Sequence, residues 1–191
     1  MSRSPARKRF GQHFLEPAWS RKVVEAIAPA TTDFFIEIGP GHGAITRLLA
    51  ERAAHVLAYE LDRDLAALLD SAGIPHVTIR QADFTAVTAA DVLGAVHDAG
   101  VPYTRLRVAG NLPYNVGAVI LVTLAALRRN GVPFADATIM LQREVADRLI
   151  AAPGTHDYGM LTIFVRQWAL DRKSTRLNSS HSQQSRMPSS A

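Results

Sequence analysis

The sequence has no cysteine among its 191 residues, which excludes disulfide bonds and cysteine-ligated metal sites. Its seven histidines show no paired ligand spacing, so no bound metal is expected. Long apolar runs are also missing. Residues 116–127 are too few to cross a bilayer, and the basic amino terminus lacks the apolar stretch of a signal peptide. We therefore expect a monomeric, cytoplasmic protein without a membrane partner.

A general excess of positive charge is missing as well. The formal net charge is +4, and the last twenty residues supply four cations and no acid, so the balance of the remainder is 4 − 4 = 0. These cations are Arg172, Lys173, Arg176 and Arg186. Any affinity for RNA must therefore come from local patches. The clearest patch is the cluster Arg7, Lys8 and Arg9 beside Phe10, with Arg3 nearby, which we expect to bind RNA.

Further basic residues offer weaker RNA candidates. Arg105 and Arg107 lie near the Asn111 segment, and Arg128 with Arg129 closes an apolar helix. Cations at a helix carboxyl end are expected from the helix dipole alone, so the Arg128 pair needs no RNA.

Apolar residues make up 48% of the chain, enough to bury a sizeable core. Apolar strand patterns alternate with helical ones, which predicts an α/β fold with a parallel sheet. The expected strands cover residues 34–39, 55–60, 76–81, 106–110 and 137–142. Asp62 should cap a helix that Gly73 ends. The helix after Tyr114 is expected to pack inside through Val119, Ile120, Leu121, Leu124 and Leu127.

The first expected strand runs into a glycine-rich turn, Glu37-Ile38-Gly39-Pro40-Gly41-His42-Gly43. Such turns let the backbone approach a nucleotide-like ligand. About twenty residues later a second strand ends in Glu60, a carboxylate placed to accept ribose hydroxyl hydrogens. A third leads into Asp83 and Phe84, which could hold an adenine. The glycine pattern alone also fits nicotinamide dinucleotide enzymes. Glu37, Asp83 and the segment at Asn111 favour S-adenosylmethionine instead.

The tetrapeptide Asn111-Leu112-Pro113-Tyr114 follows the fourth expected strand. The amine of adenine is a poor nucleophile because its lone pair is conjugated with the ring. The amide oxygen of Asn111 and the carbonyl of Leu112 could each accept one amine hydrogen, while Pro113 holds the turn rigid. The ring of Tyr114 could stack on the base. These four residues are the predicted catalytic site for methylating an exocyclic amine.

The chain resembles the ribosomal RNA adenine dimethyltransferases through an ordered series of motifs. They are Arg7-Lys8-Arg9-Phe10-Gly11-Gln12-His13-Phe14-Leu15, Glu37-Ile38-Gly39-Pro40-Gly41, Glu60-Leu61-Asp62, Gly110-Asn111-Leu112-Pro113-Tyr114-Asn115, Met140-Leu141-Gln142-Arg143-Glu144-Val145 and Tyr158-Gly159. The resemblance implies a class I S-adenosylmethionine-dependent methyltransferase, with a Rossmann-like sheet, that dimethylates adjacent adenines of small-subunit ribosomal RNA. It assigns cofactor contacts to His13, Leu15, Gly39, Gly41, Glu60, Leu61, Asp83, Phe84 and Asn111.

The resemblance also sets the expected domains. Residues 1–16 would form a basic arm and residues 17–171 the catalytic domain. The family's last strands and small helical carboxyl-terminal domain would be absent. Residues 172–191, rich in serine, are expected to be disordered; a foreign origin is favoured over a natural flexible tail that binds RNA. Two alternatives stay open: a macrolide-resistance type of methyltransferase acting on large-subunit ribosomal RNA, and a non-catalytic RNA-binding assembly factor.

Overall fold

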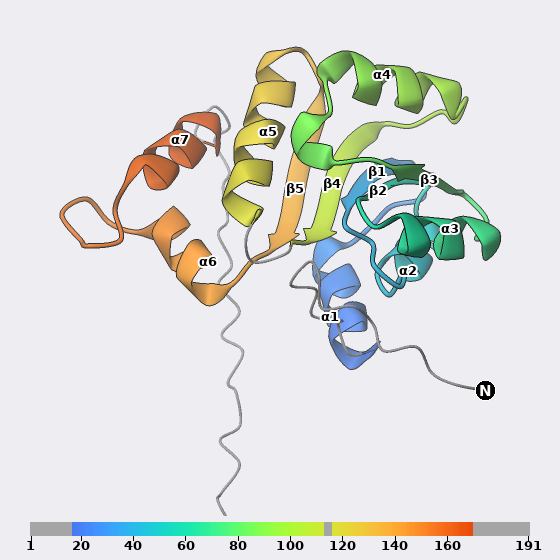
Figure 1. Cartoon of the computed structure of the whole chain (residues 1–191), viewed down its shortest axis with the longest axis horizontal. Helices are drawn as coiled ribbons and strands as arrows, with labels where there is room; N and C mark the ends of the chain where they lie inside the picture. Colours follow the sequence, from blue (N-terminus) through green and yellow to red (C-terminus); the bar gives the residue numbers. More distant parts are fainter. Residues whose placement is uncertain (1–16, 113–115, 170–191) are drawn as a thin grey trace, which may run out of the picture. The chain divides into compact units, whose positions relative to one another are not determined.

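The computed structural model describes residues 17–112 and 116–169, and its centre is a five-stranded parallel sheet. The strands pair in the order β3-β2-β1-β4-β5 (Figure 1). Their bounds are β1 Asp33–Ile38, β2 His55–Glu60, β3 Val77–Gln81, β4 Arg105–Asn111 and β5 Phe134–Met140. All four pairings are parallel. The α/β class with a Rossmann-like sheet is thus confirmed.

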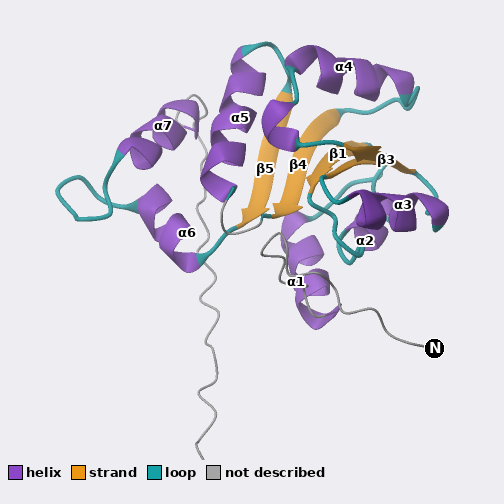
Figure 2. Cartoon of the chain, viewed as in Figure 1, coloured by secondary structure: helices purple, strands orange, loops and turns teal. Residues whose placement is uncertain are grey.

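Helices connect the strands and cover both faces of the sheet. They are α1 Pro17–Ile27, α2 Thr46–Ala50, α3 Arg63–Ser71, the 3₁₀ turn η1 Phe84–Ala86, α4 Ala89–Asp98 and α5 Gly117–Arg129. Figure 2 shows α1, α2 and α3 grouped on one side of the sheet, with α4 and α5 on the other. Within the two described ranges, no helix is long and apolar enough to span a membrane.

A second compact unit begins at Ala146, within α6 (Arg143–Ile150). It contains the end of α6 and α7 (Met160–Ala169). The Thr162 hydroxyl donates to the carbonyl of Arg148, and the Arg166 guanidinium donates to the carbonyl of Ala151 at 2.8 Å. These bonds hold the two helices of this unit together.

The core forms around β1, whose six residues are all buried. Burial on both faces is the usual state of a central parallel strand, and it explains the unbroken apolar run from Phe34 to Ile36. On one face Phe35 packs with Val24 of α1, Leu49 of α2 and Val56 of β2. These contacts pack α1 and α2 against the central strands, and the resulting core holds the carboxyl ends of the strands in place.

The expected elements agree with the structure, with two differences. Asp62 caps α3 by accepting from the amides of Asp64 and Leu65, and Gly73 follows with φ 55°. The fifth strand, however, covers Phe134–Met140 rather than 137–142, because Phe134 and Asp136 pair with Leu106 and Arg107 of β4. On α5, Val119 is 50% exposed although it was expected inside.

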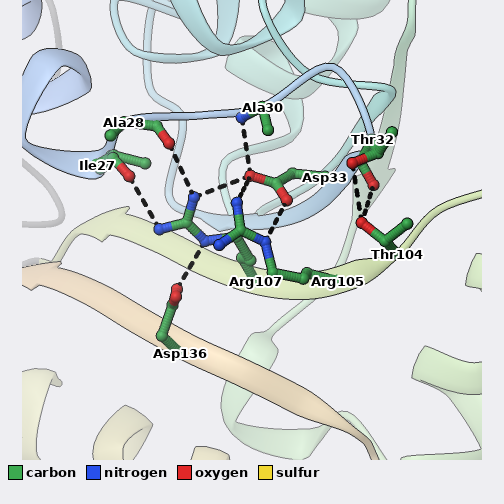
Figure 3. Close-up of polar contacts among 9 residues, drawn as sticks. All are labelled: Ile27, Ala28, Ala30, Thr32, Asp33, Thr104, Arg105, Arg107 and Asp136. Atoms are coloured by element: carbon green, nitrogen blue, oxygen red, sulfur yellow. Dashed lines mark hydrogen bonds and ion pairs between the residues drawn. The ribbon is translucent and has the colours of Figure 1, made fainter. Parts of the chain in front are cut away.

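Arg107 joins three elements at the amino ends of the strands (Figure 3). Its guanidinium contacts Asp33 of β1 at 2.9 Å and Asp136 of β5 at 2.8 Å. It also donates to the carbonyl of Ile27 at 2.9 Å, so the last turn of α1 is bound as well. The Arg107 side chain is 7% exposed and that of Asp33 is fully buried. One buried cation thus links α1 to three strands of the sheet.

Asp33 is the shared anion of this network. It accepts two hydrogen bonds from Arg105, at 2.7 and 2.8 Å, and one from the Ala30 amide at 2.9 Å. Burial raises the pKa of Asp33, but the hydrogen bonds from Arg105, Ala30 and Arg107 outweigh it and leave the pKa below its usual value. The carboxylate is therefore ionised at neutral pH, and together with Asp136 it balances the charge of the two arginines.

We predict that Arg107→Met lowers the free energy of unfolding by about 3–5 kcal/mol, because it leaves the Asp33 charge buried with less compensation. Urea denaturation measures the change. The matched control is Arg80→Met, since Arg80 meets Asp98 at 3.8 Å with side chains 49% and 69% exposed. That exposed pair should be worth less than about 1 kcal/mol. Equal losses in the two variants would contradict the role given to Arg107.

Candidate active site

The candidate site lies at the edge of the sheet where the parallel strands end. Ile38 pairs with Tyr59 of β2 and with Gly110 of β4, so the residues that follow these strands are neighbours in space. The amide of Gly39 donates to the carbonyl of Tyr59 at 2.9 Å. In open α/β sheets, ligands bind at this edge. The predicted residues Gly39, Glu60, Asp83 and Asn111 all follow or end strands here.

The turn after β1 depends on glycine for its shape. Gly39, Gly41 and Gly43 have φ of 68°, 58° and 78°, a region that residues with a Cβ rarely adopt. A Cβ at Gly43 would lie 2.6 Å from the side chain of Leu69, so space is restricted as well. The turn leads into α2, which is only five residues long. Because these glycines carry no side chains, the turn presents mainly backbone groups.

Glu60 ties the glycine turn to the end of β2. One of its carboxylate oxygens accepts from the Gly41 amide at 3.0 Å, and the other accepts from the Asp62 amide at 2.9 Å. The residue is only 2% exposed. Each oxygen retains a second lone pair, so the carboxylate can hold the turn and still accept from a ligand hydroxyl. The neighbouring Leu61 is 45% exposed.

The segment after β3 contributes Asp83 and Phe84. The Asp83 carboxylate caps η1 by accepting from the Thr85 amide at 2.9 Å and from the Thr85 hydroxyl at 2.7 Å. Asp83 is exposed, whereas Phe84 is 4% exposed and packs edge-on against Tyr59 with ring centroids 5.3 Å apart. The acid therefore faces solvent, and the ring serves mainly as core.

The end of β4 lies very close to β1. A Cβ at Gly110 would come within 2.9 Å of the Ile38 carbonyl oxygen, and one at Gly39 would lie 3.9 Å from the Asn111 carbonyl oxygen. Leu112 is buried, and its amide donates to the Met140 carbonyl of β5 at 3.1 Å. Gly110 thus allows β4 to lie close to β1, and the predicted catalytic segment lies beside the predicted cofactor turn.

Glu37 is a further acid at this edge, and among the described residues the Thr46 hydroxyl is the group that offsets its burial. It is 2% exposed, and its Oε2 atom lacks a hydrogen-bond partner among the described residues. Burial raises the pKa of Glu37 to about 7; the nearby Thr46 hydroxyl opposes the rise and the charge of Glu60 adds to it. The sequence showed an acid two residues before the first glycine, but periodicity could not show that its carboxyl is unpaired.

A family model described as ribosomal RNA adenine dimethylase matches residues 3–173. The chain belongs to this family. The curated relatives include the ribosomal RNA small subunit methyltransferase A of Bordetella petrii, 45% identical over 87% of this chain and 59% of that protein. The protein of the same name from Aromatoleum aromaticum is 42% identical over 87% of this chain and 58% of its own length. The chain therefore spans less than two thirds of these relatives.

Solved structures support the fold of this adenine dimethylase family member. A dimethyladenosine transferase from Plasmodium falciparum matches with a TM-score of 0.64 and 23% identity, over 81% of this chain and 52% of that one. The 23S rRNA methyltransferase ErmE matches with a TM-score of 0.55 and 25% identity, over 78% of this chain and 53% of its own. Both likenesses place the sheet in the class I methyltransferase fold.

Several predicted residues of this family member lie outside the described ranges. They are Arg7, Lys8, Arg9, Phe10, His13, Leu15, Pro113 and Tyr114. In the described part of the chain, no group of three or more His, Asp or Glu side chains is arranged to hold a metal ion.

The structure gives Arg105 and Arg107, which were considered as RNA contacts, a role within the fold. Both lie at the amino ends of the strands, opposite the Asn111 edge, and both are bound to Asp33. Arg128 donates to the Phe134 carbonyl at 2.6 Å, in agreement with a structural role at the end of α5. Sequence proximity to an active strand could not reveal that these guanidinium groups are used within the fold.

We predict that Gly110→Ala lowers the free energy of unfolding by about 1–3 kcal/mol, because its Cβ would overlap the Ile38 carbonyl and separate β1 from β4. Gly94→Ala on α4 is the matched control, since a Cβ there meets no atom within 4 Å. Alanine should stabilise that helix by up to about 1 kcal/mol. Urea denaturation of both variants measures the difference, and a stable Gly110→Ala protein would show that the strands have room to spare.

Proposed function

We propose that this chain is the catalytic part of an S-adenosylmethionine-dependent methyltransferase that dimethylates the exocyclic amines of adjacent adenines in small-subunit ribosomal RNA. Family membership supports the reaction class. The name shared by the curated relatives supports the small subunit as the source of the RNA. We further propose that the protein acts as a monomer in the cytoplasm, on ribosomal RNA or a pre-ribosomal particle.

The observation that carries this proposal is the closeness of the glycine turn, Glu60 and Asn111. Glu60 holds Gly41 by a hydrogen bond of 3.0 Å, and a Cβ at Gly39 would lie 3.9 Å from the Asn111 carbonyl oxygen, so the turn and the Asn111 backbone are neighbours. A cradle without Cβ atoms fits a ligand that must approach the backbone closely. The lone pairs left on Glu60 fit a ribose, and the exposed Asp83 fits the amine of an adenine.

The bound cofactor would supply an electrophilic methyl group on a sulfonium. The chain's own residues would position the acceptor. The Asn111 amide oxygen and the Leu112 carbonyl would each accept one hydrogen of the target amine and turn its lone pair toward the methyl group. Positioning and electrostatics would then account for most of the rate enhancement. The target adenine must leave its base stack to reach this edge.

Two other functions remain as outcomes of the test. The fold shared with ErmE keeps large-subunit RNA as a possible substrate. A chain that spans 58–59% of its relatives could also bind RNA without turnover. The identities of 41–45% to small-subunit enzymes favour the first proposal.

Methyl transfer from labelled S-adenosylmethionine tests the proposal directly. We expect label in adenines of undermethylated small-subunit particles and none in large-subunit RNA. Tyr114→Ala should slow transfer by the equivalent of about 1–3 kcal/mol through lost base stacking, while Tyr114→Phe, which keeps the ring, should not. Label in large-subunit RNA alone would instead identify the macrolide-resistance activity. RNA binding without any transfer would identify an assembly factor.

The role of Glu60 gives a prediction for cofactor binding alone. Glu60→Ala should weaken binding of S-adenosylmethionine by about 1.5–3 kcal/mol, because a charged acceptor is lost from both the ribose and the Gly41 amide. Calorimetry measures the affinity. Glu51→Ala is the matched control, since Glu51 is an exposed acid at the end of α2. An unchanged affinity in Glu60→Ala would remove Glu60 from the site.

A further inference from the structure

Two buried carboxyl groups lie next to the glycine turn with no cation beside them in the described part of the chain. Glu37 of β1 and Glu60 of β2 are each 2% exposed. Glu60 is satisfied, because its two oxygens accept from the amides of Gly41 and Asp62. Glu37 is not, because its Oε2 atom has no hydrogen-bond partner among the described residues, and the only hydroxyl shown near it there is that of Thr46. A buried polar atom without a partner costs about 1–3 kcal/mol, so its presence calls for an explanation.

The surroundings of Glu37 contain little that could balance a negative charge. It pairs with Ala58 of β2 and Ala109 of β4, neither of which carries charge. The Thr46 hydroxyl at the start of α2 lies near Glu37 and opposes the rise of its pKa. The charge that acts on Glu37 is the negative charge of Glu60. Burial and this charge both favour the protonated form of Glu37.

A ligand can change that balance. S-adenosylmethionine carries a sulfonium and an ammonium against one carboxylate, so a net positive charge would enter the edge beside Glu37. A positive charge near a buried acid favours its ionised form. A neighbouring cation would also provide the electrostatic partner that the Oε2 atom lacks.

We propose that Glu37 is a proton-exchange group of the cofactor site, protonated in the free protein and ionised when the cationic methionine end of the cofactor is bound. The O–H bond of Glu37 breaks, its electron pair stays on the carboxylate, and the proton passes to the solvent. This inference rests on the proposed function, since it requires a cationic cofactor at the glycine turn. It gives a function to a buried carboxyl group whose Oε2 atom has no hydrogen-bond partner in the described part of the fold.

The direction of the pH dependence follows from linkage. The pKa of Glu37 is about 7 in the free protein and must be lower in the complex. Binding therefore releases a proton at pH values between the two, and affinity rises with pH by up to about tenfold per unit. Above about pH 7 the acid is already ionised, so this contribution to the affinity becomes constant.

Calorimetric titration of the full chain with S-adenosylmethionine tests the proposal. At about pH 6, titrations in phosphate and in imidazole, which differ in ionisation enthalpy, should report release of nearly one proton, and at about pH 8 release should fall toward zero. Glu37→Gln, which keeps the shape of the protonated acid, should bind without release at either pH. A variant that releases as many protons as the parent would overturn the proposal.

The parental protein alone also decides the point if Glu37→Gln does not fold. A binding heat that is the same in both buffers at about pH 6 would overturn the inference and leave the proposed function intact. Failure of the parental chain to bind the cofactor at all would overturn the proposed function and this inference with it. A buffer-dependent heat that disappears with a midpoint near pH 7 would support Glu37 as the source of the proton.

Discussion

The buried ion pair between Arg107 and Asp33 is the constraint on which the geometry of this domain depends. Their 2.9 Å contact joins the amino ends of β4 and β1, and a further contact to Asp136 adds β5. Side chains alternate along a strand, so a slip of one residue would turn every side chain to the wrong face. The pair helps fix the register in which Ile38 meets Gly110. That register brings Gly39 and Asn111 together at the far end of the same two strands.

The buried acids at the two ends of the sheet differ in how well their negative charge is balanced. At the amino ends, the Asp33 carboxylate accepts from Arg105, Arg107 and the Ala30 amide, and these bonds keep its pKa below the usual value. At the carboxyl ends, Glu37 and Glu60 are buried on neighbouring strands, and among the described residues only Glu60 has donors to both oxygens. Residues that break a rule of burial are expected at sites of function. The imbalance at the carboxyl ends is therefore the feature from which we propose that a ligand supplies the missing partner.

The sequence predicted the fold well because its signals are local. Apolar runs marked the first four strands to within a residue or two, and Asp62 and Gly73 marked the limits of α3. The fifth strand was misplaced by three residues at its start, because Asp136 interrupts the apolar pattern and becomes acceptable only through its bond to Arg107. Val119 was misjudged because α5 is apolar nearly all round, so sequence alone does not tell which side faces solvent.

The sequence by itself determined the order of strands and helices, the glycine turn, and the acids that follow the strands. These features depend on backbone conformation and on hydrophobic periodicity, which neighbouring residues specify. Only the tertiary structure decided which side chains find partners: Arg105 and Arg107 bind Asp33, Phe84 packs on Tyr59, and the Oε2 atom of Glu37 has no hydrogen-bond partner among the described residues. The physical reason is that ionisation, burial and hydrogen bonding depend on residues that are far apart in the chain and meet only when the sheet has formed.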